Sequence, residues 1–270
     1  MKYKLLLLII PLLFFSLPRK KGFTLKKISG QHFFDKRYQA PLPPNEIFNQ
    51  PYYYLGSGKE CYAFASKDNQ YVIKFFKQKH ISLKPWHQFF PFLFHEKIKK
   101  RIRLREKTFD SYMIAYKELK KESGVLYLHL NTEQGFNQTL TLFDHKNQKH
   151  KVNLAKMEFL VQEKAVPFLW ALQESLEKGK REQSQKLILA LILHIKNRRE
   201  KQISDNDLNC KRNLGVIQER IINIDIGEYE CKPSEISFKE EVAAAVSDLK
   251  ELLKKHELDT FFDEAVNSLL

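Results

Sequence analysis

The chain has 270 residues, enough to bury the core of one two-lobed domain or of two small domains. Hydrophobic residues make up 43%, which excludes a disordered chain, and only 9 Gly and 10 Pro with no internal period exclude a repeat or low-complexity protein. The net charge of +14 suggests anionic partners, such as phosphates, nucleic acid or an anionic membrane surface, although a merely basic soluble protein would also show it.

An apolar run of 13 residues, Leu5–Leu17, follows Lys2 and Lys4. As a helix it would span roughly 20 Å, short of the roughly 30 Å hydrocarbon core of a bilayer. That length suits a secretory signal, but no small-x-small cleavage site follows. The five Lys and Arg residues at positions 19–27 instead favour an anchor that leaves the body of the protein cytoplasmic. Residues 1–21 are therefore a signal peptide of an exported protein or a membrane anchor.

Residues 22–51 look like a connector, with Pro41, Pro43 and Pro44 in an extended piece. The next stretch, Tyr54–Lys77, has two short apolar runs around a turn that holds Gly56 and Gly58. Without a Cβ, their backbone amides can approach an anion. A third run ends in Val-Ile-Lys. If it is a central strand, Lys74 lies on the face opposite Ile73 and Phe75, where it needs a phosphate or carboxylate as counter-charge.

The aromatic-rich stretch His80–His95 is predicted to be a loop that caps the core, or else a membrane-interface patch beside a basic run. A long helix is predicted over Lys97–Lys121, ended by Gly124. Its apolar stripe comprises Ile98, Ile102, Phe109, Tyr112, Met113, Tyr116 and Leu119. At about 100° per residue, Glu106 lies roughly 20° from Met113, inside this stripe. It faces the core, or lies at the edge and pairs with a neighbouring Arg or Lys.

Four further strands are predicted, separated by polar turns. They are Val125–Leu130, Thr139–Phe143, Lys151–Leu154 and Met157–Gln162. From Pro167 the pattern becomes helical, with helices over Phe168–Lys178 and Glu182–Arg199 and two more in the tail Phe238–Leu270. His194 is predicted to be a core or edge histidine. The three cysteines, Cys61, Cys210 and Cys231, lie too far apart for a metal-ligand motif, and their odd number fits a reducing compartment slightly better.

The stretch from Ile203 to Tyr229 contains Asp207, then Asn213, then two short apolar runs and Asp225-Ile-Gly227. In this order it resembles the catalytic loop and metal-binding segment of protein-kinase-like phosphotransferases, and the Gly-turn with its strand lysine resembles their nucleotide lobe. The resemblance covers roughly residues 52–229. It implies an α+β, two-lobed fold with a nucleotide lobe of antiparallel sheet plus helix at 52–164 and a short helical lobe at 165–270.

The resemblance also implies roles for single residues. Gly56 and Gly58 would cover the phosphates of ATP and Lys74 would bind them, while Glu106 would hold Lys74. Asp207 would orient the acceptor hydroxyl and accept its proton. Asn213 and Asp225 would hold Mg²⁺, which prefers hard oxygen ligands. Backbone groups of Phe159–Ala165, where the lobes join, would contact the adenine.

Several features depart from the family pattern. Cys61 replaces the third glycine of the loop, and no His-Arg precedes Asp207, so Asp205 could share or take its role. The step from Asp207 to Asn213 is one residue longer than usual. Only about forty residues follow Asp225, without an activation segment. The short second lobe is more typical of small-molecule or lipid-sugar kinases, or of an atypical kinase, than of an ordinary protein kinase.

Three functions remain open from the sequence. The first is an ATP- and Mg²⁺-dependent phosphotransferase near a membrane, acting on an unidentified acceptor. The second is a pseudokinase that binds or scaffolds without turnover, and the third is an exported basic protein that binds anionic surfaces. Specific nucleic-acid binding is not expected, since the Lys and Arg residues are spread along the chain rather than set in a known motif.

Overall fold

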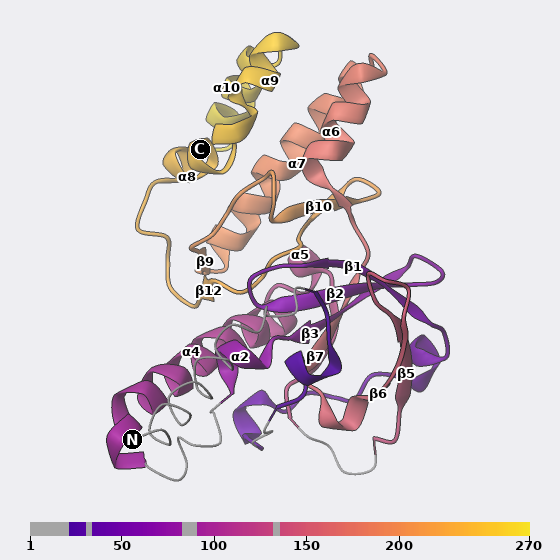
Figure 1. The fold of residues 1–270 in the computed structure, drawn as a ribbon. Helices are drawn as coiled ribbons and strands as arrows, with labels where there is room; N and C mark the ends of the chain where they lie inside the picture. The colour runs from indigo at the N-terminus through magenta and orange to yellow at the C-terminus, as the bar shows by residue number, and fades with distance from the viewer. Residues whose placement is uncertain (1–21, 31–33, 83–90, 132–135) are drawn as a thin grey trace, which may run out of the picture.

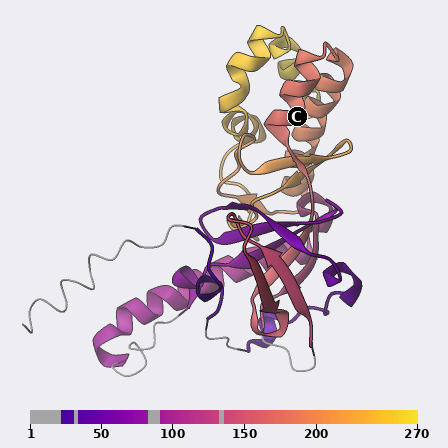
Figure 2. The ribbon, with the colours of Figure 1, turned by 45° about the vertical axis from the view of Figure 1, so that its right-hand side comes forward.

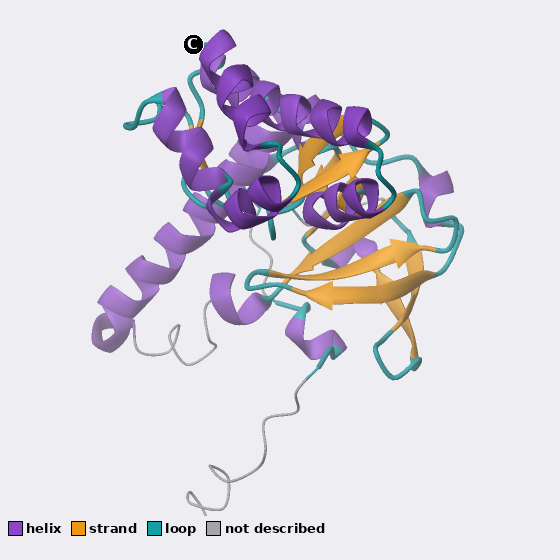
Figure 3. Cartoon of the chain, turned by 90° about the horizontal axis from the view of Figure 1, so that it is seen from above, coloured by secondary structure: helices purple, strands orange, loops and turns teal. Residues whose placement is uncertain are grey.

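The computed structural model describes residues 22–30, 34–82, 91–131 and 136–270. The chain is a mixed α+β protein in which most strands form one curled sheet and most helices gather at the other end of the molecule (Figure 1). Figure 2 shows the same two regions after a turn about the vertical axis, and Figure 3 shows the helices from above, beside the sheet. The predicted α+β class is confirmed at this level.

The main sheet has seven strands in the order β4-β7-β3-β2-β1-β5-β6. They are β1 Tyr52–Ser57, β2 Cys61–Ser66, β3 Tyr71–Phe76, β4 Val125–His129, β5 Thr139–Phe143, β6 Lys149–Asn153 and β7 Phe159–Glu163. The sequence predicted an antiparallel sheet, and this is wrong for one pair of strands, because β1 and β5 pair in parallel. The chain between these two strands runs through a long helix and three other strands, so it is long enough for a parallel connection.

The β2–β3 hairpin determines where the strand lysine lies. Its turn has Asn69 at φ 60°, a left-handed conformation that asparagine tolerates better than most residues. Ser66 donates its hydroxyl to Asp68 at 2.6 Å and accepts the Tyr71 amide at 2.9 Å, which closes the turn. β3 then pairs with β2 on one side and with β7 on the other, so it is a central strand.

The predicted connector, residues 22–51, packs against the sheet. It forms three short 3₁₀ turns, η1 Leu25–Lys27, η2 Lys36–Tyr38 and η3 Asn45–Phe48. Pro44 has φ −63° and ψ 143°, the extended conformation expected from the proline-rich sequence. Phe23, Ile28 and Phe48 are buried in the core inside the curled sheet. This segment therefore contributes to the sheet region instead of only linking it to the N-terminus.

The long helix α4 spans Pro91–Lys117, and a short helix α5, Lys120–Ser123, follows it. Gly124 ends α5 at φ 62°, as predicted for a helix-terminating glycine. The C-terminal half of α4 packs on the sheet through Phe109, Tyr112 and Met113. Ile102, which the predicted stripe also included, is 45% exposed. A four-residue helix, α2 Gln78–Ile81, precedes α4 and contacts it.

The helical region begins after β7 with a short strand, β8 Val166–Pro167, and contains α6 Phe168–Glu177 and α7 Arg181–Glu200, close to the two predicted helices. Four short strands follow: β9 Ser204–Asp205, β10 Leu214–Ile217, β11 Arg220–Asn223 and β12 Tyr229–Glu230. The tail has three α-helices and one 3₁₀ turn rather than two helices: α8 Phe238–Ala245, η5 Ser247–Leu249, α9 Lys250–Lys255 and α10 Asp259–Ser268. A separate core that includes Phe168, Ile192 and Leu249 holds this region together.

Two predictions concern residues that the structure does not describe. The apolar run 5–17 lies outside the described residues, and so do residues 83–90, half of the aromatic stretch 80–95. The loop predicted for this stretch is wrong at both of its ends, because residues 80–81 belong to α2 and residues 91–95 to the start of α4. Among the residues that are described, no helix has the length and apolar character needed to cross a bilayer.

Candidate functional site

Lys74 lies on the central strand β3. The strand alternates as predicted, because Ile73 and Phe75 are fully buried in the core inside the curled sheet. Lys74 is on the other face, opposite Ala63 on β2 and Leu160 on β7. This face is turned toward α4 and toward the segment around residue 225, because Cys61, Phe76 and Leu160 pack there with Ile226.

The Lys74 ammonium group donates a hydrogen bond to the backbone carbonyl of Ile224, 150 residues further along the chain. Ile224 immediately precedes Asp225, so the strand lysine and the predicted metal-binding segment meet in space. Burial lowers the pKa of Lys74, and the negative charge of Asp225 opposes this shift. Lys74 is half-buried, so its charge is screened less than that of a surface lysine and is suited to an anionic ligand.

Asn213 holds the backbone around Asp225 from the other side. Its carbonyl accepts the Ile224 amide at 2.6 Å and the Asp225 amide at 3.4 Å. Its side-chain nitrogen donates to the Asp207 carbonyl at 2.5 Å. The amide oxygen of Asn213 is thus the side-chain atom that remains for another ligand. Asp225, whose backbone amide binds the Asn213 carbonyl, is exposed. The structure brings Lys74, Asn213 and Asp225 together.

Asp207 lies on the loop that Asn213 closes. Its side chain is 54% exposed and 4.0 Å from the Arg212 guanidinium. Its backbone amide donates to the Asp205 carboxylate at 3.1 Å. Asp207 is therefore fixed through its backbone while its carboxylate faces solvent, and Asp205 acts on the backbone of the loop.

A buried polar chain supports this loop from below. Asn223 is fully buried, and its side chain donates to Asp205 at 3.0 Å and accepts from His194 Nε2 at 2.6 Å. Burial raises the pKa of Asp205 to about 6 and lowers that of His194 to about 4. His194 is neutral at pH 7 as a result, and it is a core histidine, as the sequence predicted. Gln162 on β7 donates to the Asn223 carbonyl at 2.7 Å, which joins the sheet to this chain.

The glycine turn lies between β1 and β2, and a register shift interrupts the pairing of these strands between Tyr54 and Gly56. A Cβ at Gly56 or Gly58 would meet no atom within 4 Å, so the turn has open space around it. Lys77, which is buried, donates its ammonium to the Gly58 carbonyl and lies 4.7 Å from the Tyr62 ring centroid. Lys77 thus holds the turn from the side of the sheet, and the space beside Gly56 and Gly58 is open.

Glu60 follows this turn and was not singled out from the sequence. Its Oε2 would lie 2.6 Å from a Cβ at Gly227, and among the described residues this oxygen has no hydrogen-bond partner although it is buried. Burial, and then the charge of Asp225, raise the pKa of Glu60 to about 7. The only signal in the sequence was a carboxylate directly after the glycine turn, and nothing indicated that it would reach Gly227.

Glu106 does not hold Lys74. Its carboxylate instead accepts from the Arg37 guanidinium at 2.8 Å. The pairing fails because Arg37, on η2, lies next to this turn of the helix, which the spacing of the α4 stripe could not reveal. Two α4 residues near this turn bind the segment after Asp225. The Ser111 hydroxyl donates to the Ile226 carbonyl at 2.6 Å and accepts the Tyr229 amide at 2.7 Å, and the Lys107 ammonium donates to the Glu228 carboxylate at 2.6 Å.

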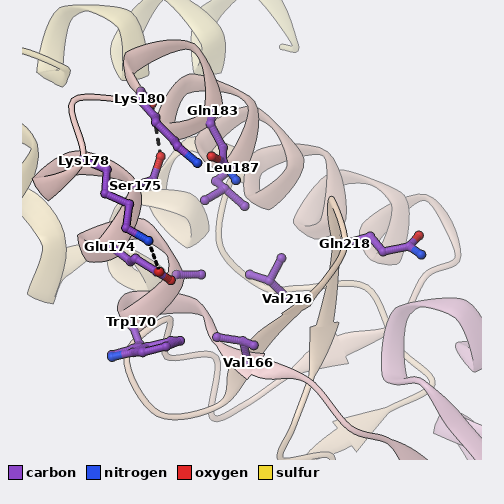
Figure 4. Close-up of a pocket in the computed structure, with 11 residues that line it drawn as sticks. Val166, Trp170, Glu174, Ser175, Lys178, Lys180, Gln183, Leu187, Val216 and Gln218 are labelled. Carbon is purple, nitrogen blue, oxygen red and sulfur yellow. Dashed lines mark hydrogen bonds and ion pairs between the residues drawn. The ribbon is translucent and has the colours of Figure 1, made fainter. Parts of the chain in front are cut away.

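A cavity of about 300 Å³ lies in the helical region, away from these contacts (Figure 4). Val166 and Val216 form one wall, and Trp170, 58% exposed, stands beside them. Lys178 pairs with Glu174 at 2.5 Å at its rim. None of the predicted site residues lines this cavity, so we do not assign the candidate site to it.

The residues that meet around Asp225 fit a nucleotide with Mg²⁺. Among the residues that the structure covers, no group of three or more His, Cys, Asp or Glu side chains could hold a metal ion. Mg²⁺, however, is usually bound by one or two carboxylates together with substrate phosphates and water, so Asp225 with the Asn213 amide oxygen is a sufficient protein donor set. The open glycine turn and Lys74 are suited to the phosphates.

Comparison with known proteins gives only a distant similarity. No protein-family model matches the chain, and no curated protein matches it. Solved structures of WbdD, a bifunctional kinase-methyltransferase, are similar at TM-scores of 0.39 for a complex with the kinase inhibitor LY294002 and 0.40 for a 2.2 Å crystal structure, both at 16% identity. They cover 76% and 75% of this chain, which spans 39% and 38% of those chains.

Proposed function

We propose that the chain is a kinase-like phosphotransferase that uses ATP and Mg²⁺ near a membrane, on an acceptor still to be identified. The observation that carries this proposal is the hydrogen bond from Lys74 to the Ile224 carbonyl. It joins the strand lysine to the Asp225-Ile-Gly227 segment, in the order in which the family places its phosphate-binding lysine and its metal-binding aspartate.

In this proposal the chain positions the phosphates and neutralises their charge. The amides of the Gly56–Gly58 turn face the phosphates from above, and Lys74 exchanges its carbonyl partner for a phosphate oxygen. Burial strengthens that contact, because a charge pair is screened less away from water. Asn213 and Asp225 hold Mg²⁺, which when bound offsets part of the charge on the transferring phosphoryl group.

Asp207 is the residue proposed to orient the acceptor hydroxyl and take its proton. Its carboxylate is exposed, while its backbone is fixed by Asp205 and Asn213. A general base needs both features, because it must reach a substrate and still hold one geometry. Asp205, which is half-buried, supports the loop by accepting the Asp207 amide rather than by meeting the acceptor.

Calorimetric titration of the full chain with ATP tests the proposal. We expect binding that requires Mg²⁺, and a loss of affinity of about tenfold or more, roughly 1.4 kcal/mol, in Asp225→Ala. Asp263→Ala, at an exposed position on α10 in the helical tail, is the matched control and should bind as the wild type does. Absence of binding at millimolar nucleotide, or equal binding by Asp225→Ala, would refute the proposal.

A nucleotide-binding pseudokinase is the second candidate, and one observation favours it. Glu106 is bound to Arg37, and among the described residues no carboxylate forms an ion pair with Lys74. A site without that pair could bind ATP without completing transfer. Release of ³²P-labelled phosphate, or its transfer to an added membrane fraction, separates the two candidates: Asp207→Asn should abolish it in an enzyme, whereas a pseudokinase shows none in the wild type.

The location at a membrane rests on the sequence of residues 5–17. We propose that they anchor the chain with its body in the cytoplasm, where ATP is available; export is the alternative. Sequencing of the N-terminus of the mature protein, together with fractionation, decides between them. An uncleaved chain in the membrane fraction supports the anchor, and a processed chain outside the cytoplasm contradicts it.

A further inference from the structure

The N-terminal half of α4 extends beyond the sheet (Figures 1 and 2). The helix has 27 residues and is therefore about 40 Å long. Its C-terminal half is covered by the sheet, with Phe109 and Tyr112 no more than 3% exposed, whereas Phe92 and Leu93 near its start are 76% and 64% exposed. A projecting helix end with bare apolar side chains needs an explanation beyond packing of this chain.

Cations and apolar residues share one face of this helix end. At about 100° per residue, seven of them lie within a single arc of about 160°, whereas Phe94, Ile98, Arg101 and Ile102 lie outside it. The face, called here the α4 outer face, consists of Phe92, Leu93, Lys97, Lys99, Lys100, Arg103 and Leu104. Within residues 92–104 the same arc holds only one acid, Glu96.

The four cations of the α4 outer face have no carboxylate partners within the described part of the chain. Lys97 approaches only the Phe94 ring, at 5.6 Å, and Lys99, Lys100 and Arg103 form no ion pair there. The opposite side of the helix is held in place, since Arg101 donates to the carbonyls of Lys79 at 2.7 Å and Ser82 at 2.9 Å. The outer face is therefore fixed in orientation and uncompensated in charge.

We propose that the α4 outer face is a docking surface for an anionic lipid bilayer. Phe92 and Leu93 enter the boundary between headgroups and acyl chains, and the four cations bind headgroup phosphates. A helix that mixes exposed large apolar side chains with Lys and Arg matches this surface on both counts. A nucleic acid would use the cations but would leave Phe92, Leu93 and Leu104 in water, so the lipid is the better match.

This docking surface is connected to the candidate site by the same helix. Ser111, which binds the Ile226 carbonyl, lies 19 residues after Phe92, or about 29 Å along the helix axis. Docking would thus hold the Asp225 segment at a fixed distance from the bilayer. The inference itself rests on α4 alone and does not require ATP binding.

Sedimentation of the full chain with vesicles tests the charge. Binding is compared between neutral vesicles of phosphatidylcholine and vesicles that also contain the anionic lipid phosphatidylglycerol. Any insertion of residues 5–17 would occur in both, so the difference in binding measures attraction to the anionic lipid. We expect phosphatidylglycerol to strengthen binding, and the combined variant Lys97→Gln, Lys99→Gln, Lys100→Gln and Arg103→Gln to reduce this gain about tenfold or more. Exchange of the same four residues between Lys and Arg should preserve it.

The matched control removes four exposed cations at the far side of the sheet, by Lys146→Gln, Lys149→Gln, Lys151→Gln and Lys156→Gln. It lowers the net charge equally and should keep the gain from phosphatidylglycerol within about twofold. Equal losses in the two variants would show that only net charge matters and would overturn the proposal. The proposal would also be overturned if the combined α4 variant kept the full increase in binding that phosphatidylglycerol causes. The same holds if that variant lost binding to a single-stranded oligonucleotide but kept its binding to vesicles.

The apolar contact has its own readout. A fluorophore at Leu93→Cys, in a chain with Cys231→Ser because Cys231 is the exposed cysteine, should shift to the blue on anionic vesicles and be quenched by brominated lipid. The same label at Lys151→Cys should not respond. A label at residue 93 that stays in water when the chain is vesicle-bound would contradict the proposal. Urea unfolding of the variant with the four replaced cations, expected to match that of the wild type, shows that the variant is folded. Because this readout does not depend on ATP binding, it keeps the inference separate from the proposed function.

Discussion

Several ionisable side chains near Asp225 are buried or half-buried, which makes their charged forms less favourable than in water. Three ionisable side chains there have pKa values displaced by burial: Lys74 and His194 downward, Glu60 upward. Perturbed pKa values are common at functional sites, because the charges that suit a ligand are unfavourable in its absence. Of these residues Glu60 is the most informative, since its buried Oε2 has no hydrogen-bond partner among the described residues.

We predict that Glu60→Gln stabilises the chain in alkaline solution. The pKa of Glu60 is raised from its usual value of 4.5 to about 7 in the folded protein, so the stability linked to its neutral form is complete below pH 4.5 and is lost as the pH rises through 7. Urea unfolding with a chelator present should show a gain of about 1–3 kcal/mol at pH 8 and almost none at pH 4.5. Glu219→Gln, an exposed control, should show neither, and a loss of stability at pH 8 in Glu60→Gln would contradict the assignment.

Asn223 is the residue on which the buried polar chain depends. We predict that Asn223→Ala lowers the free energy of unfolding by about 2–4 kcal/mol, because it leaves Asp205 and His194 buried without their partner. Thermal or urea unfolding at neutral pH measures this. The control is Asn206→Ala, because the Asn206 side chain makes only an exposed hydrogen bond to Glu230. It should lower the free energy of unfolding by less than about 1 kcal/mol. Equal losses in the two variants would mean that Asp205, Asn223 and His194 do not act as one buried network.

At the scale of elements, alternation along a strand predicted more than periodicity along a helix. The face of Lys74 followed from Ile73 and Phe75, because a strand has only two faces and both neighbours are apolar. The partner of Glu106 did not follow from its stripe, because a helical wheel shows which side of α4 is apolar but not which segment covers each turn. Arg37, which covers it, comes from 69 residues earlier in the chain.

This difference gives a prediction for α4. Glu106→Gln should leave ATP affinity within about twofold of the wild type and change the free energy of unfolding by less than about 1 kcal/mol, because its ion pair with Arg37 is exposed. Titration calorimetry and urea unfolding check both. A large loss of ATP affinity in Glu106→Gln would restore the pairing with Lys74 that the sequence suggested.

At the scale of the whole molecule, the order of motifs in the sequence predicted which distant segments meet. A glycine turn, a strand lysine, an asparagine and an Asp-x-Gly follow one another over some 170 residues, and the fold brings the last three together. Glu60 and Ser111 could not be found in this way, because their contacts with Gly227 and Ile226 depend on how the sheet and α4 pack, which no local pattern encodes.

The helical region is pinned to the loop by a buried ion pair. Arg198 is fully buried, pairs with Glu241 on α8, and donates to the Ile203 carbonyl at 2.7 Å just before β9. Burial alone would raise the pKa of Glu241, yet Arg198 and Arg199 together hold it below its usual range. Arg198 therefore fixes the backbone at the start of the loop that carries Asp207. The turn at Gly56 and Gly58, by contrast, has open space around it.

Labelling of lysines by an acyl phosphate of ATP tests the central claim most directly. The probe transfers its acyl group to a lysine at the bound phosphates, and mass spectrometry of the labelled full chain identifies it. We expect Lys74 to be labelled in the presence of Mg²⁺, protected by excess ATP, and far less labelled in Asp225→Ala. Lys77, whose ammonium is bound to the Gly58 carbonyl, is the internal comparison and should be labelled less. Labelling of Lys74 that ATP does not protect, or labelling confined to surface lysines, would contradict the account.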